Sequence, residues 1–184
     1  MRPDGWPDGQ FDVIYADPPW PFVGGPQKTV ERHYPTMPLE EIAALPVAEA
    51  AAESAAVFIW VVNSFTWAVF DVIDAWGFPR ESASKAATWC KLTTTGKRWF
   101  RGLGHRVAQQ TETCWIATRG GGMKPALVPE EILEARIREH SRKPDAMYRR
   151  IEAMYPESRY LELFARQQRD GWQSWGNDTL RFPA

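Results

Sequence analysis

The residues whose types and spacing first suggest chemistry are an acid, two prolines and a tryptophan in succession: Asp17, Pro18, Pro19 and Trp20. They directly follow an apolar run, residues 11–16, that has the composition of a buried strand. Because proline has no backbone N–H to donate, the strand must end there and present the acid and the tryptophan at its carboxyl edge. Ligands bind at this edge of open α/β sheets. The motif therefore has two interpretations, a site or a proline turn with a tryptophan packed beneath it.

A second group of residues has the composition of a nucleic-acid contact. Between residues 93 and 110, Trp99, Phe100 and several glycines are interleaved with four cations, Lys97, Arg98, Arg101 and Arg106. Cations attract phosphates, and aromatic rings stack on bases. A solvated loop without a partner is the alternative. The nucleic-acid interpretation gains weight only if the neighbouring site handles a base.

Apolar patterning predicts the elements that position these residues. Strands are expected over residues 11–16, 56–62, 84–91, 113–118 and 160–165, and residues 132–138 fit either a strand or a helix. Three helices are expected: a short one capped by Thr36 and ended by Pro46, one capped by Ser64 and closed by Gly77, and one with Pro144 at its first position and Pro156 after its end. This alternation predicts an α/β, Rossmann-like layer fold with a largely parallel sheet. The Gly- and Pro-rich residues 22–37 are a candidate lid over the first motif.

Composition limits the classes of protein to consider. The 184 residues, 44% apolar and 24% charged, predict one soluble globular domain over residues 1–184. No signal peptide or membrane span is expected, so the predicted location is cytoplasmic. Cys90 and Cys114 form no CxxC pair, and His33, His105 and His140 are isolated, so we expect free thiols and no metal site. The net charge of −1 does not by itself indicate a nucleic-acid-binding protein.

Three stretches, taken together and in this order, resemble one known family. They are residues 17–20, residues 141–145 (SRKPD), and residues 162–166 (ELFAR) with 171–177 (GWQSWGN). This set resembles the adenine N(6)-methyltransferases related to the catalytic subunit of the eukaryotic messenger-RNA adenosine methyltransferase, a family that includes bacterial and phage DNA methylases. Residues 33–37 and 102–105 also match.

The resemblance implies a Rossmann-like, S-adenosylmethionine-dependent methyltransferase in permuted order. The catalytic motif then lies near the N-terminus and the cofactor strand near the C-terminus, which agrees with the absence of a G-x-G-x-x-G fingerprint. Only ten residues precede Phe11, so we cannot match a contact to the cofactor adenine, and we expect a bare catalytic core of the bacterial or phage type.

Residue roles follow from the same resemblance. Asp17 and the carbonyl of Pro18 would accept hydrogen bonds from the adenine amine, in a turn fixed by Pro19, and Trp20 and Tyr34 would sandwich the base. Substrate contacts are expected from Lys97, Arg98, Arg101 and His105. The residues expected to hold the cofactor are Asp17, Lys143, Glu162, Arg166, Gln168 and Asn177.

The expected activity is methylation of adenine N(6) in DNA, with RNA as the alternative polymer. A catalytically silent paralogue that binds nucleic acid or scaffolds a partner is a second alternative, and a small-molecule methyltransferase a third. The expected partner is nucleic acid, and the chain is expected to act as a monomer or homodimer.

Overall fold

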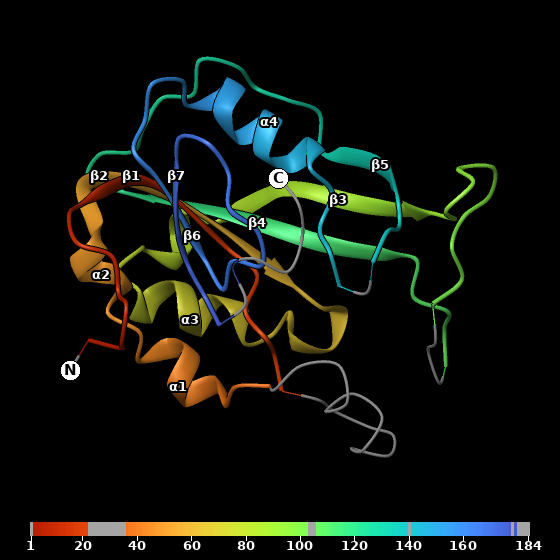
Figure 1. Cartoon of the computed structure of the whole chain (residues 1–184), viewed down its shortest axis with the longest axis horizontal. Coiled ribbons are helices and arrows are strands. Elements are labelled where there is room, and N and C mark those ends of the chain that lie inside the picture. The colour runs from red at the N-terminus through yellow and green to blue at the C-terminus, as the bar shows by residue number, and fades with distance from the viewer. Residues whose placement is uncertain (1, 22–35, 103–105, 140, 178, 180–184) are drawn as a thin grey trace.

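The computed structural model of the chain contains one seven-stranded sheet with helices on both faces (Figure 1). It describes residues 2–21, 36–102, 106–139, 141–177 and 179. The strands are β1 (Phe11–Ala16), β2 (Ala51–Val61), β3 (Ser84–Leu92), β4 (Thr111–Arg119), β5 (Ile132–Arg136), β6 (Tyr160–Leu163) and β7 (Trp172–Trp175). The α-helices are α1 (Leu39–Ala43), α2 (Val47–Ala50), α3 (Val69–Ala75) and α4 (Ala146–Met154), and short 3-10 turns occupy Asn63–Phe65 and Arg80–Ser82.

The direction of the strands gathers the loops of the chain at one edge. The sheet order is β5-β3-β4-β2-β1-β6-β7, and β4 alone runs antiparallel to its two neighbours. The carboxyl ends of the other six strands therefore meet at the edge where β4 begins. The predicted Rossmann-like α/β fold is confirmed, with the first motif after β1 and the predicted cofactor strand at β6.

Two hydrophobic cores, one on each face, hold the helices to the sheet. Ile14 and Ala16 of β1 pack in the core that includes the buried residues of α1 and α3. Val13 and Tyr15 pack in the other core, together with Met147 and further buried residues of α4. Both faces of β1 are thus buried, as the continuous apolar run predicts. In Figure 1, α4 covers one face and α1, α2 and α3 cover the other.

The predicted helix starts are wrong in three places. Ser64 lies inside the 3-10 turn, and α3 begins only at Val69 without a side-chain cap, because Phe65 inserts into the core and stacks on Trp20. Thr36 does not cap α1, which follows Pro38. Pro144 precedes the first helical residue of α4 by two positions, and the carboxylate of Asp145 pairs with Arg138 instead of capping the helix.

The strand predictions differ from the structure mainly at their ends. The ambiguous residues 132–138 form β5, which pairs in parallel with β3. β2 starts five residues before the predicted strand. This start was not predicted because Glu53 and Ser54 are exposed and interrupt the apolar pattern at an irregular part of the strand. β6 stops at Leu163 because Phe164 has a φ of 61°. β7 was not predicted. None of the helices in the described part of the chain is long and apolar enough to cross a bilayer.

Candidate active site

Four charged side chains of alternating sign form a chain at the carboxyl edge of the sheet. The ammonium group of Lys143 lies 2.7 Å from Asp17 Oδ2 and 3.3 Å from Glu112 Oε2. Glu112 Oε1 in turn lies 2.5 Å from Lys91 Nζ. The side chain of Lys143 is only 9% exposed, so these contacts are largely shielded from water. The cluster brings together four parts of the chain: the end of β1 with Asp17, the end of β3 with Lys91, the start of β4 with Glu112, and the loop before α4 with Lys143.

Burial and charge act in opposite directions on these groups. Burial raises the pKa of Asp17, and the attraction of Lys143 reduces this effect without cancelling it. Burial opposes the ionisation of Glu112 as well, but Lys143 and Lys91 outweigh it and lower its pKa. Burial also disfavours the charged form of Lys143, yet its two carboxylate neighbours raise its pKa above the usual value. Lys143 is therefore cationic at neutral pH.

Glu112 is a residue of this cluster that the sequence analysis missed. It is the second residue of β4, and because β4 runs antiparallel, its first residues lie at the same edge as the last residues of β1 and β2. The signal in the sequence was an acid at the start of an apolar strand. Only the pairing of the strands shows that this acid faces Lys143.

A pocket lies beside the cluster; its empty space of about 350 Å³ includes a part that is open to solvent. Its lining includes Tyr15 and Asp17 from β1 and its end, Lys143 and Tyr148 around the start of α4, and Glu162 and Arg166 around the end of β6. Two further lining residues, Ser141 and Phe164, have φ values of 64° and 61°. Non-glycine residues rarely adopt this conformation, and such positions cluster at functional sites.

Glu162 is a buried carboxyl group with an acceptor to spare. Its exposure is 6%, and Tyr148 donates a 2.7 Å hydrogen bond to its Oε1. Its Oε2 is buried and has no hydrogen-bond partner among the described residues. Burial raises its pKa to about 8. A buried carboxyl oxygen of this kind fits a ligand with hydroxyl groups, such as a ribose, because a hydroxyl can either donate to the carboxylate or accept from the protonated acid.

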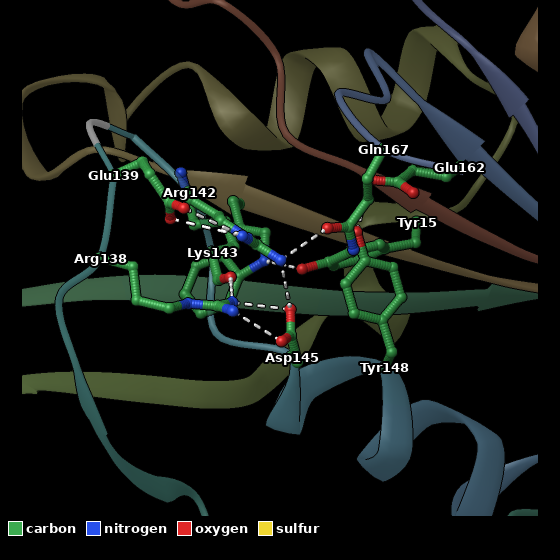
Figure 2. A network of polar contacts seen from close by, with 10 residues as sticks. Tyr15, Arg138, Glu139, Arg142, Lys143, Asp145, Tyr148, Glu162 and Gln167 are labelled. Atoms are coloured by element: carbon green, nitrogen blue, oxygen red, sulfur yellow. Dashed lines mark hydrogen bonds and ion pairs between the residues drawn. The ribbon is translucent and has the colours of Figure 1, made fainter. Parts of the chain in front are cut away.

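Polar contacts fix the loop that carries Lys143 (Figure 2). Arg138 forms two 2.6 Å hydrogen bonds to the carboxylate of Asp145 and one of 3.0 Å to the carbonyl of Lys143. Arg142 contacts Glu139 at 3.2 Å and donates to Gln167 Oε1 at 3.2 Å, which ties this loop to the segment after β6. These contacts hold the backbone from which Lys143 reaches Asp17. Arg142 and Asp145 belong to the motif at residues 141–145, whereas the sequence analysis missed Arg138, Glu139 and Gln167.

The structure brings some of the predicted site residues together and leaves others apart. Asp17, Lys143, Glu162 and Arg166 line the pocket. Gln168 and Asn177 are exposed and are not among the lining residues, whereas Gln167, the neighbour of Gln168, is buried in the lining. Tyr34 and His105 lie outside the described residues. The roles assigned to all of these residues remain predictions.

The proline–tryptophan part of the first motif is tightly bound to its surroundings. The carbonyl of Pro18 accepts a 2.9 Å hydrogen bond from the backbone N–H of Trp20, and that of Pro19 accepts one of 2.9 Å from Met37. Trp20 is 7% exposed and donates from its Nε1 to the carbonyl of Trp60 at 2.9 Å. Its ring is therefore packed beneath the site, and its stacking on a base remains a prediction.

The described parts of the connection between β3 and β4, residues 93–102 and 106–110, form a hairpin arm that continues past the sheet edge (Figure 1). Phe100 N–H donates to the carbonyl of Lys91 in β3 (2.8 Å), which joins the first part of the arm to that strand, and Gly102 N–H donates to the Gln109 carbonyl across the arm (3.0 Å). The predicted cations on this arm are all exposed, and none forms an ion pair with another described residue: Lys97, Arg98, Arg101 and Arg106. No group of three or more metal-ligating side chains occurs among the described residues.

The fold and the pocket define a Rossmann-like protein with an acidic residue and a cation at the ligand-binding edge of its sheet. A family model described as MT-A70 matches residues 11–178, and the chain belongs to this family.

The chain is similar to three curated proteins that differ in length. It is 33% identical over 172 residues to a probable N(6)-adenosine-methyltransferase MT-A70-like of Oryza sativa. This alignment covers 92% of the chain and 23% of the relative. It is 30% identical to the N(6)-adenine-specific methyltransferase METTL4 of Homo sapiens (94% of the chain, 38% of the relative). It is 28% identical to the type II methyltransferase M.MunI of a Mycoplasma species (92% and 78%). The chain spans about a quarter of the length of the plant relatives it matches.

Proposed function

We propose that this protein transfers a methyl group from S-adenosylmethionine to the N(6) amine of adenine in DNA. The observation that carries the proposal is the Lys143–Asp17 pair, largely shielded from water, at the carboxyl edge of the sheet. Beside it lies a pocket that contains Glu162, whose Oε2 has no hydrogen-bond partner among the described residues. The family to which the chain belongs and the names of its relatives support the chemistry.

The lining of the pocket fits the cofactor. Lys143, kept cationic by its two carboxylate neighbours, would pair with a carboxylate of the ligand, and Glu162 and Arg166 would hold its ribose. Gln168 and Asn177 are proposed to contact the cofactor from outside the pocket lining. When bound, the cofactor supplies an electrophilic methyl group on its sulfonium.

Asp17 acts on the amine as a hydrogen-bond acceptor and not as a conventional base. The lone pair of the adenine amine is delocalised into the ring, which makes the nitrogen a poor nucleophile. Asp17 and the carbonyl of Pro18 are two acceptors that hold the N–H groups and orient the nitrogen, which is orientational and electrostatic catalysis. The carbonyl of Pro18 can do so while it accepts from Trp20, because a carbonyl oxygen has two lone pairs. In a duplex the base must first be flipped out of the stack.

DNA is favoured over RNA by the lengths of the relatives. The type II methyltransferase M.MunI, a DNA-modifying relative, has 78% of its length covered. A relative named as an N6-methyladenosine RNA methyltransferase, MTA1 of Cryphonectria parasitica, has 52% covered. The exposed cations of the hairpin arm and its half-exposed ring, Trp99, are suited to either polymer. We further propose that the protein acts in the cytoplasm as a monomer or homodimer.

The test is a transfer assay with methyl-labelled cofactor and matched DNA and RNA oligonucleotides, followed by digestion and detection of N(6)-methyladenine. We expect the label in DNA, and Asp17→Asn to lower kcat at least a hundredfold. Asp12→Asn is the matched control, because Asp12 lies on β1 at the other end and pairs with Arg159.

Three outcomes would contradict the proposal. Label in RNA alone would show that the substrate is RNA and not DNA. Undiminished transfer by Asp17→Asn would overturn the proposed role of Asp17. Cofactor binding without transfer to any polymer would favour a catalytically silent protein.

A further inference from the structure

Trp67 exposes 66% of its surface on the connection between β2 and α3. Most tryptophans in folded proteins are largely buried, because their rings bring a large apolar area. The indole Nε1 of Trp67 donates to the carbonyl of Ser64 at 3.1 Å, so the ring is oriented by its own backbone turn. The connection follows a strand that ends at the same edge as β1.

Two buried aromatic rings support Trp67 from below. Its ring lies 6.2 Å from that of Phe65, measured between centroids, and Phe65 is only 3% exposed. Phe65 in turn stacks on Trp20 at 6.0 Å with 16° between the ring planes. Trp20 belongs to the motif that contains Asp17. Trp67 is thus the outer, solvent-facing member of a row of three rings that begins at the candidate active site.

The surroundings of Trp67 point to an anionic polymer. The side-chain amide of Asn63, at the start of the same connection, donates to the side chain of Gln109 and, at 3.3 Å, to the carbonyl of Thr111. Asn63 therefore ties this connection to the hairpin arm that carries the exposed cations Lys97, Arg98, Arg101 and Arg106. An oriented, exposed indole on a connection tied to the base of this cationic arm matches the surface that binds single strands and extruded bases.

We propose that Trp67 stacks on a base that neighbours the target adenine, and so positions the polymer for transfer. This rests on the proposed function, because it assumes that the polymer is the substrate of the site. Asp17 and the pocket would select the reacting base, whereas Trp67 would hold the strand next to it. Stacking is tolerant of sequence, because every base has a flat π-face.

The test uses four variants and two kinds of oligonucleotide. Trp67→Ala is expected to raise KM for an intact oligonucleotide about tenfold with little change in kcat, whereas Trp67→Phe should keep most of the affinity. Trp67→Leu, which is apolar but has no π-face, should behave like Trp67→Ala. Val128→Ala is the control, because Val128 is 82% exposed and lies in the segment before β5 begins, at the opposite edge from the site.

Oligonucleotides with an abasic site on the 5′ or the 3′ side of the target identify the contact. At the position that stacks, the abasic site should weaken binding to the wild type about as much as Trp67→Ala does, and the two losses should not add. An unchanged KM in Trp67→Ala, or additive losses on both sides, would overturn the proposal. Fluorescence anisotropy of the same oligonucleotides measures binding without catalysis. If the wild type transfers no methyl group, the proposed function fails, and the anisotropy still decides whether Trp67 stacks.

Discussion

Lys143 lies between two carboxylates, so the loss of one side chain affects three charges. Without it, Asp17 would have no ammonium partner, and Glu112 would keep only Lys91. Removing one member of a largely buried ion pair leaves an uncompensated charge, which costs far more than the pair itself contributes. The residue is therefore important for stability as well as for the proposed binding of the cofactor.

We predict that Lys143→Met lowers the free energy of unfolding by about 3 kcal/mol and abolishes cofactor binding. Urea denaturation and calorimetric titration with the cofactor measure the two effects. In the double variant Lys143→Met/Glu112→Gln, one carboxylate is neutral, so part of the stability should return while cofactor binding stays lost. Equal losses in the single and double variants would contradict the proposed repulsion.

The second prediction concerns the protonation of Glu162. Burial raises its pKa from 4.5 to about 8, so between these values the native state holds a proton that the unfolded chain has released. The free energy of unfolding contributed by this group is therefore full below pH 4.5 and is lost as the pH rises towards 8. Glu162→Gln should remove this dependence. The difference in stability between wild type and variant should change by roughly 4 kcal/mol from pH 5 to pH 8.5, measured by urea denaturation. A constant difference would show that Glu162 is already ionised in the native state.

At the scale of the elements, a substitution in the hairpin arm can test the proposed binding of the polymer separately from the proposed binding of the cofactor. Each phosphate contact contributes about 0.7–0.9 to the slope of log K against log salt concentration. We predict that Lys97→Gln lowers this slope for an oligonucleotide by about 1 and leaves cofactor affinity unchanged. Lys124→Gln, an exposed lysine after β4 at the opposite edge, should change neither. Anisotropy titrations between low and moderate salt measure the slopes, and equal slopes for both variants would exclude Lys97 as a phosphate contact.

The turn after β4 provides a test of the fold itself. Gly120 and Gly121 have φ values of 66° and 87°, but only at Gly120 would a Cβ atom collide with the backbone carbonyl of Glu53. Gly121→Ala should cost about 1 kcal/mol, the strain of a left-handed conformation. Gly120→Ala should cost clearly more, because the start of β2 must also move. Thermal unfolding of the two variants compares them, and equal costs would show that β2 adapts easily at Glu53.

Local chain chemistry explains which elements could be predicted from the sequence. β1 was correct at both ends, because a run buried on both faces stops at two prolines. The end of β6 and the start of α3 were wrong, because Phe164 adopts an uncommon φ and Phe65 leaves the helical path to stack on Trp20. The Phe65–Trp20 contact joins segments distant in sequence, and the φ of Phe164 is an uncommon backbone conformation; an apolar pattern in a single sequence contains neither.

At the scale of the whole molecule, the proposed binding of the cofactor is linked to folding. The lining of the pocket comes from the end of β1, the loop before α4, α4 itself and the segment after β6. A ligand that binds only the folded state adds about 2.7 kcal/mol at a concentration of 100 Kd. We predict that S-adenosylmethionine at this excess raises Tm by roughly 5–10 °C, as measured by scanning fluorimetry. Glu162→Ala should shift less, and adenosine triphosphate at the same concentration should produce no comparable shift.

The candidate site was predictable from the sequence in part. Asp17, Lys143, Glu162 and Arg166 were assigned through motifs that the resemblance supplied, and the structure places all four around one pocket. Glu112, Tyr148 and Gln167 were not assigned, because each lies in a stretch without a motif and reaches the site only through the pairing of strands or the packing of α4. The site is thus formed by tertiary contacts that join the motifs.

The reversed direction of β4 has a consequence for how such proteins diversify. Because β4 runs against its neighbours, β3 ends and β4 begins at the same edge of the sheet. The arm is a module with two adjacent attachment points, so its length and sequence can change without rebuilding the strands that hold Asp17 and Glu162. If the arm binds the polymer as proposed, exchanging it between relatives should transfer the preference for one polymer to the other member.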